Sequence, residues 1–189
     1  METKIKFHED FKKAKKEAKS EHKLLFLFFH HPECGGCNKT INETFQDDNA
    51  VRMINERFIP MSFLTTKEKD LACEYGVEWT PSFMIVDDEG KELDRWEGFL
   101  PAEEFIPQLL LAEGLSYFRK QKYGKAISCL NEAVSKYPES GFTPQATYYL
   151  GICQYKESED ISSLRETYEK LHNRFPESYW TKKASPWVH

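Results

Sequence analysis

Residues 24–37, LLFLFFHHPECGGC, carry the strongest structural signal in the chain. Leu24 to Phe29 form an unbroken apolar run, which is short enough for a β-strand buried on both faces. Two cysteines follow at a spacing of three, and the residues after Cys37 show a helical pattern. The pattern therefore predicts a buried strand, a short loop, and a helix that begins beside Cys34.

The spacing of Cys34 and Cys37 allows a small disulfide ring on one helical turn. Unpaired N–H groups and the positive end of the helix dipole favour the thiolate form of a cysteine at this place. The thiolate is the attacking species in disulfide exchange. We therefore expect Cys34 to attack a substrate disulfide and Cys37 to resolve the mixed disulfide.

Zinc sites use the same cysteine spacing, but they need further ligands. The sequence has no second C-x-x-C, although His30 and His31 lie close by. We favour the redox interpretation and expect no metal, and a metal site or an inert pair stay open as alternatives. Three more cysteines are isolated on helical segments and are predicted to be small apolar fillers: Cys73, Cys129 and Cys153.

Helical and strand patterns alternate through the first half of the chain. The predicted helices span residues 7–19, 36–56 with an interruption near 46–49, and 67–75. The predicted strands span residues 24–29, 58–64, 82–86 and 92–96, and the last two surround the turn signal of residues 87–90. A further helix opens at Pro101, a residue tolerated in the first helical turn.

These pieces, together with Thr80-Pro81-Ser82-Phe83 and Trp96-Glu97-Gly98-Phe99-Leu100, resemble the thioredoxin family over about residues 4–112. The resemblance implies an α/β thioredoxin fold, in which helices flank a central mixed sheet. It also implies that Pro81 is a cis-proline beside the dithiol and that the Thr80 backbone pairs with bound substrate. Such a protein uses a redox-active disulfide and needs no cofactor, only an electron donor.

The sequence departs from thioredoxins proper at several positions. Their buried aspartate, which accepts the proton of the second cysteine, is replaced by Phe28, and the tryptophan before the first cysteine is replaced by Glu33. His30, His31 or Glu33 could take over proton transfer, or all three could be solvated loop residues. Trp79 is either a core residue or an exposed aromatic edge for substrate docking.

The second half of the chain shows helical periodicity and an internal repeat. Tyr137-Pro138-Glu139-Ser140 recurs as Phe175-Pro176-Glu177-Ser178, 38 positions later. The spacing of Gly114 and Ala126 resembles a tetratricopeptide repeat, in which small residues permit close approach of paired helices. We expect a thioredoxin-like domain at 1–107 and an all-α domain at 108–189, with two repeats and a C-terminal cap. Two repeats are fewer than a solenoid usually needs, so further packing must support them.

Composition limits the partners and the compartment. The formal charge of −5 gives no reason to expect nucleic acid. No apolar run is long enough to cross a bilayer, so we expect no membrane. The first twenty residues do not have the pattern of a signal peptide. We expect a cytoplasmic location, with a periplasmic or exported one open if a signal peptide was removed.

We therefore expect a thiol–disulfide oxidoreductase whose substrates are protein disulfides. An unidentified electron donor and a protein partner at the repeat face complete the expected set of partners. The alternative is a non-catalytic adaptor with a thioredoxin-like fold, in which the dithiol is idle or senses redox state.

Overall fold

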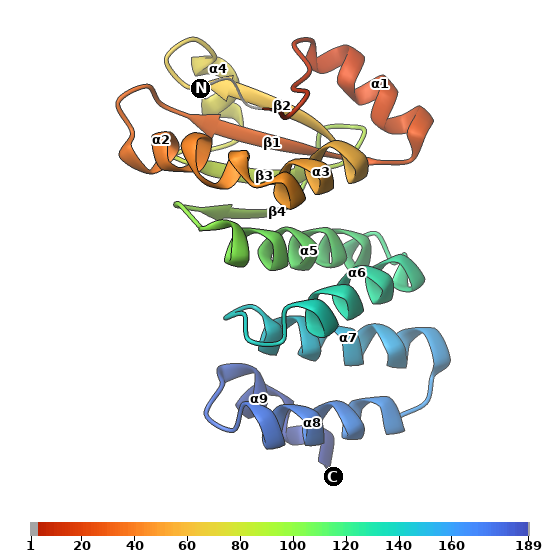
Figure 1. Ribbon diagram of the computed structural model, residues 1–189. Coiled ribbons are helices and arrows are strands. Elements are labelled where there is room, and N and C mark those ends of the chain that lie inside the picture. Colours follow the sequence, from red (N-terminus) through yellow and green to blue (C-terminus); the bar gives the residue numbers. More distant parts are fainter. Residues whose placement is uncertain (1–3, 189) are drawn as a thin grey trace. The chain divides into compact units, whose positions relative to one another are not determined.

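The computed structural model describes residues 4–188, and its internal contacts divide the chain into two compact units (Figure 1). The division falls between Ile106 and Pro107. It lies inside helix α5 (Ala102–Arg119), which therefore contributes residues to both units.

The first unit is built on a mixed four-stranded sheet with the strand order β2-β1-β3-β4. Strand β1 (Leu24–His30) pairs in parallel with β2 (Phe58–Leu64) and antiparallel with β3 (Ser82–Val86). Strand β4 (Glu92–Glu97) pairs antiparallel with β3 and completes the predicted hairpin. The first six residues of β1 are buried, which explains its unbroken apolar run. The expected mixed sheet with flanking helices is confirmed.

Side chains alternate between the two faces of the sheet, so β1 contributes to two cores. Leu25, Leu27 and Phe29 share one core with residues of α1 (Phe11–Glu21) and α4 (Lys69–Glu74). On the other face, the ring of Phe26 contacts that of Phe105, and the ring of Phe28 contacts that of Phe45. The sheet therefore lies between two helical layers.

The segment after the dithiol is helical, with the break that the sequence predicts. It comprises α2 (Gly35–Asn42), a 3-10 turn (Thr44–Gln46) and α3 (Asp48–Arg57). The carboxylate of Asp47 accepts hydrogen bonds from the N–H groups of the second and third residues of α3, at 3.0 and 2.9 Å. This N-cap explains why a new helix starts there.

The first helix begins at Phe11, and the prediction that it includes Phe7 is wrong. The Asp10 carboxylate accepts a hydrogen bond from the N–H of Lys13 at 3.0 Å and caps the helix at this point. The ring of Phe7 instead stacks on Phe28, with centroids 6.5 Å apart. Phe7 therefore lies at a helical spacing from Phe11 in the sequence, although it does not belong to α1.

The second unit consists of helical pairs. It contains the C-terminal part of α5, then α6 (Tyr123–Lys136), α7 (Thr143–Ser158), α8 (Ser162–Arg174), α9 (Tyr179–Ala184) and a 3-10 turn (Ser185–Val188). A Cβ atom added at Gly114 would lie 2.7 Å from Cγ of Leu130 on α6, so glycine permits the predicted close approach. The segment after α8 packs aromatic rings, among them Trp180 and Trp187, on Tyr148.

None of the helices within residues 4–188 is both long enough and apolar enough to cross a membrane.

Candidate active site

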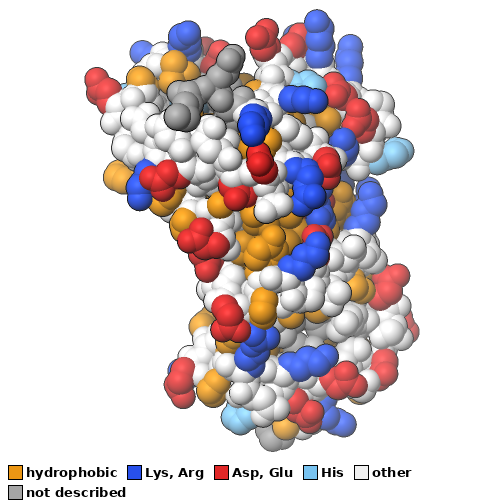
Figure 2. Space-filling view, viewed as in Figure 1, with side chains coloured by type: hydrophobic (Ala, Val, Ile, Leu, Met, Phe, Trp, Pro, Cys, Tyr) orange, Lys and Arg blue, Asp and Glu red, His pale blue; other side chains and the backbone are white. Residues whose placement is uncertain are grey.

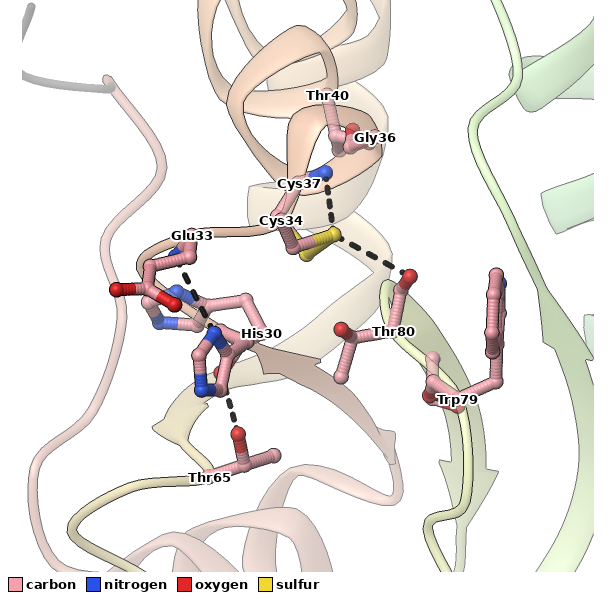
Figure 3. The surroundings of a disulfide bond; sticks show 11 residues. His30, Glu33, Cys34, Gly36, Cys37, Thr40, Thr65, Trp79 and Thr80 are labelled. Carbon is pink, nitrogen blue, oxygen red and sulfur yellow. Dashed lines mark hydrogen bonds between the residues drawn. A yellow bond between two sulfur atoms is a disulfide. The ribbon is translucent and has the colours of Figure 1, made fainter.

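The two cysteines of the dithiol occupy different environments at the start of α2 (Figure 3). Cys34 is the N-cap residue, and its Sγ accepts a hydrogen bond from the Cys37 N–H at 3.1 Å. The two residues form a disulfide, with Cα atoms 5.2 Å apart. Cys34 is half-buried, whereas Cys37 is fully buried. Of the two sulfur atoms, that of Cys34 is therefore the one a large substrate can reach.

Thr80 and Pro81 lie directly beside this sulfur. The peptide bond between them is cis, as the resemblance implies. The Thr80 carbonyl oxygen is 3.3 Å from the Sγ of Cys34, and in Figure 3 it points at the sulfur. In the reduced state, the Cys34 thiol can donate a hydrogen bond to this oxygen.

Gly36 allows the helix start to come close to the cis-proline. A Cβ atom at this position would lie 3.1 Å from Cδ of Pro81 and 3.9 Å from the Sγ of Cys34. At Gly35, by contrast, no atom lies within 4 Å of an added Cβ. The two glycines of the motif therefore differ in packing, and the sequence alone does not show this difference.

A groove of about 500 Å³ opens beside Cys34. Its lining residues come from the dithiol loop, from the end of β2 and from the segment before β3: His31, Cys34, Gly35, Gly36, Thr65, Val77, Glu78, Trp79, Thr80 and Pro81. Sequence reasoning did not single out Thr65, Val77 or Glu78. Thr65 reaches the dithiol only through the pairing of β2 with β1, whereas Val77 and Glu78 directly precede the predicted residues Trp79, Thr80 and Pro81.

Trp79 is 66% exposed, so it is not a core residue. Figure 3 places it on the side of Thr80 away from the sulfur atoms. Its carbonyl oxygen accepts a hydrogen bond from the hydroxyl of Ser82 at 2.8 Å, which holds its backbone at the groove. The position suits an aromatic edge for docking, and that role stays a prediction.

The three residues proposed for proton transfer lie in different places. His31 lines the groove, and its Nδ1 accepts a hydrogen bond from the Glu33 N–H at 3.2 Å. His30 is half-buried, and its ring stacks on that of Phe28 with centroids 4.9 Å apart. Burial lowers the pKa of His30 and so favours its neutral imidazole. The Glu33 side chain is exposed.

The position of the thioredoxin aspartate is occupied by a buried phenylalanine in this chain. Phe28 is 1% exposed, and its ring contacts those of Phe7, Phe45 and Phe83 as well as His30. A proton acceptor for Cys37 must therefore come from another residue or from water.

The remaining cysteines differ from one another. Cys73 is exposed, so the prediction that it fills a core is wrong; the sequence pattern did not reveal that it lies on the outer face of the short helix α4. Cys129 and Cys153 are buried, as predicted, and burial raises the pKa of Cys153 to about 12. Within residues 4–188, no group of three or more His, Cys, Asp or Glu side chains has a geometry that could hold a metal ion.

Comparison with known proteins adds family information to this geometry. A model of the thioredoxin-like domain matches residues 11–113, and a model of the tetratricopeptide repeat matches residues 108–140 and 145–178. A protein disulfide-isomerase of Zea mays is 24% identical over 167 residues, which are 84% of this chain and 29% of that protein. The chain thus spans less than a third of that relative's length.

Two solved structures are also similar to this chain. The solution structure of a "putative disulphide-isomerase" from Bacteroides thetaiotaomicron is 25% identical, with a TM-score of 0.52, over 59% of this chain and 95% of that one. A thioredoxin from Thermus thermophilus is 26% identical, with a TM-score of 0.46, over 51% of this chain and 78% of that one. The matched family domain includes both the dithiol and the cis-proline.

Proposed function

The chain belongs to the thioredoxin-like family, and from this premise we propose that it is a thiol–disulfide oxidoreductase acting on protein disulfides. One observation carries the proposal: a half-buried Cys34 faces a groove beside the cis-proline, while its partner Cys37 is fully buried. A nucleophile that meets the substrate and a shielded resolving thiol are what a two-step exchange requires.

In the reducing direction, the Cys34 thiolate attacks one sulfur of the substrate disulfide. A mixed disulfide forms, and the second substrate sulfur leaves as a thiolate. The Cys37 thiolate then attacks the Cys34 sulfur, which forms the intramolecular disulfide and releases the first substrate sulfur. The substrate gains two electrons and the protein loses them, so a dithiol donor must restore the reduced state, and no bound cofactor is required.

The surrounding residues support these steps. The Thr80 backbone and Pro81 form the wall against which an extended substrate lies, and Trp79 offers an apolar surface at the rim. His31 lines the groove, and because its Nδ1 accepts a hydrogen bond, its Nε2–H can donate a hydrogen bond to the leaving thiolate. The exposed, unpaired Cys73 is compatible with a reducing compartment such as the cytoplasm.

The decisive test is equilibration of the protein with glutathione buffers of graded potential, followed by a count of free thiols. A reversible two-electron transition should appear in the wild type, disappear in Cys34→Ser and persist in the matched control Cys73→Ser. Reduction of insulin should show the same dependence. If Cys34 and Cys37 stay reduced in every buffer, the proposal is wrong.

The repeats are proposed to recruit a protein partner or substrate. A Cys37→Ser variant should accumulate the mixed disulfide with a bound protein substrate. A photo-crosslinking residue placed at Tyr179, which is 66% exposed in the second unit, should then capture the same protein. Capture by the cysteine without any capture at positions on the second unit would count against recruitment.

A second candidate function is a non-catalytic, redox-sensing adaptor. The apolar surroundings of Phe28 favour it, because they lack the carboxylate that speeds proton loss from the resolving thiol in thioredoxins. The adaptor predicts a reversible dithiol transition without turnover of insulin. Turnover that depends on Cys34 would exclude it.

A further inference from the structure

One wall of the substrate groove is an irregular segment that contacts the core through its first residue, Val77, and is buried at its last, Pro81. Val77 is half-buried and Glu78 and Trp79 are exposed. Residues 77–81, all of which the structure describes, belong to no helix or strand. The position of this wall must therefore be set by the contacts at its two ends.

The downstream end is tied to the sheet. The Pro81 carbonyl oxygen accepts a hydrogen bond from the Gly98 N–H at 2.8 Å, and the Trp79 carbonyl oxygen accepts one from the Ser82 hydroxyl at 2.8 Å. Ser82 belongs to β3 and Gly98 directly follows β4, so the downstream end is fixed to these two strands.

At the upstream end, the Val77 N–H donates to the Ala72 carbonyl at 2.8 Å and the Gly76 N–H to the Cys73 carbonyl at 3.0 Å, and Tyr75 is buried. A side chain on β4 adds a further contact to this end. Arg95 pairs with Met84 in the sheet, and Met84 belongs to the core on the face that α4 covers. The guanidinium Nη2 donates to the Tyr75 carbonyl at 2.6 Å, and Nη1 approaches the Gly76 carbonyl at 3.5 Å. These carbonyls follow the last turn of α4, where backbone oxygens lack helical partners and the dipole favours a cation.

The guanidinium is itself held in one orientation. Its Nε donates to one carboxylate oxygen of Glu92 at 2.7 Å, and its Nη2 also contacts the second oxygen. The guanidinium group of Arg95 therefore binds two partners at once. Its Nε and Nη2 face the carboxylate of Glu92, while its Nη1 and Nη2 face the two backbone carbonyl groups. A lysine has the charge but lacks this planar arrangement of donors.

We propose that Arg95 is a positioning residue for substrate binding, which fixes the groove wall through the carbonyl groups of Tyr75 and Gly76. The inference rests on the proposed function, because it assigns a role in presenting the wall to a disulfide-containing peptide. Arg95 is not among the residues that line the groove, so its effect must pass through the segment that follows Gly76.

The test compares Arg95→Gln with the wild-type full chain, using Arg52→Gln as a control with the same charge change. Arg52 lies on α3 and bonds Asn49 at 3.0 Å. For a disulfide-bridged peptide, Arg95→Gln should raise KM about tenfold with kcat within about twofold, because the wall contributes binding geometry. Alkylation of the reduced Cys34 by iodoacetamide should stay within about twofold. Amide hydrogen exchange over residues 77–80 should be about tenfold faster.

Each result decides between a positioning role and a general structural role. An unchanged KM together with unchanged exchange at 77–80 would overturn the proposal, and so would full recovery of KM in Arg95→Lys, since charge alone would then suffice. If Arg95→Gln slows peptide reduction and Cys34 alkylation by the same factor, the substitution changes the reactivity of the Cys34 thiolate, and the proposal is wrong. If the wild type does not reduce the peptide at all, the proposed function fails, and hydrogen exchange alone then decides the role of Arg95.

Discussion

Replacement of each glycine in the dithiol motif by alanine separates helix propensity from packing against the cis-proline. Neither Gly35 nor Gly36 has a positive φ, so alanine can adopt both backbone conformations. Both residues lie in the first turn of α2, and alanine should stabilise a helix there by about 0.5 kcal/mol or more. An added Cβ meets no atom within 4 Å at position 35, but lies 3.1 Å from Cδ of Pro81 at position 36.

The magnitude follows from this difference. A distance of 3.1 Å is tighter than ordinary van der Waals contact, so the Pro81 ring or the start of α2 must move by a few tenths of an ångström. Overpacking costs about 1–3 kcal/mol, and the lower end applies to a shift this small. We therefore expect Gly35→Ala to be more stable than Gly36→Ala by about 1 kcal/mol, which is about 4 °C in Tm for a unit of this size.

The assay is thermal unfolding of both oxidised variants beside the wild type, followed by peptide-disulfide reduction. Gly36→Ala should also slow the reduction about threefold, because its strain falls on Pro81, next to the Thr80 carbonyl that contacts the Cys34 sulfur. Gly35→Ala should not slow it. Equal gains in Tm for the two variants would refute the reasoning, since they would show that Pro81 does not require a glycine at position 36.

Three more measurements test other parts of the structure. Gly151→Ala should destabilise the second unit by about 1–3 kcal/mol, because the added Cβ would lie 2.6 Å from Cβ of the buried Thr167. A second substitution, Thr167→Ala, should recover part of this loss. If urea unfolding shows that Gly151→Ala leaves the free energy of unfolding unchanged, the packing described here is wrong. Burial lowers the pKa of His30 below its ordinary value of 6.5. As the pH falls, His30 therefore takes up a proton more readily in the unfolded chain than in the folded one. The free energy of unfolding should decrease as the pH drops below about 6.5. The His30→Gln variant should lose less stability than the wild type between pH 7.5 and 5.5, and an equal loss would exclude His30 as the cause. Iodoacetamide should modify the exposed Cys73 in the native protein and reach Cys153, whose pKa is raised to about 12, only after unfolding; mass spectrometry of native samples that shows modified Cys153 would disprove its burial.

Elements whose pattern is local were predicted well. The strand at residues 58–64 and the hairpin strands follow apolar runs and a turn signal, and their observed bounds agree closely with the prediction. The start of the first helix was predicted wrongly because the Phe7 ring serves a contact with Phe28, and apolar periodicity cannot distinguish such a contact from a helical face. The structure instead shows that the Asp10 carboxylate caps the helix at its start.

The residues of the candidate site also separate into those that local motifs predict and those that only the folded structure reveals. Cys34, Cys37 and Pro81 could be named from short motifs, since a dithiol at a helix start and a proline before a strand have local causes. Thr65 could not be named, because it lines the groove only after β1 pairs with β2. The exposure of Cys73 and Trp79 was likewise undecidable from residue type, since both are apolar side chains often found in cores.

The amino-acid sequence alone was enough to specify the fold class, the dithiol and the helical repeats. The dithiol depends on spacing within a few consecutive residues, the repeats on a recurrence 38 positions apart, and the fold class on a family resemblance over about residues 4–112. The tertiary structure decided which side chains meet across long sequence separations: the Thr80 carbonyl at the Cys34 sulfur, Gly36 at Pro81, and Arg95 at the carbonyl of Tyr75. Such contacts depend on strand order and register, which arise only when separate segments pack together.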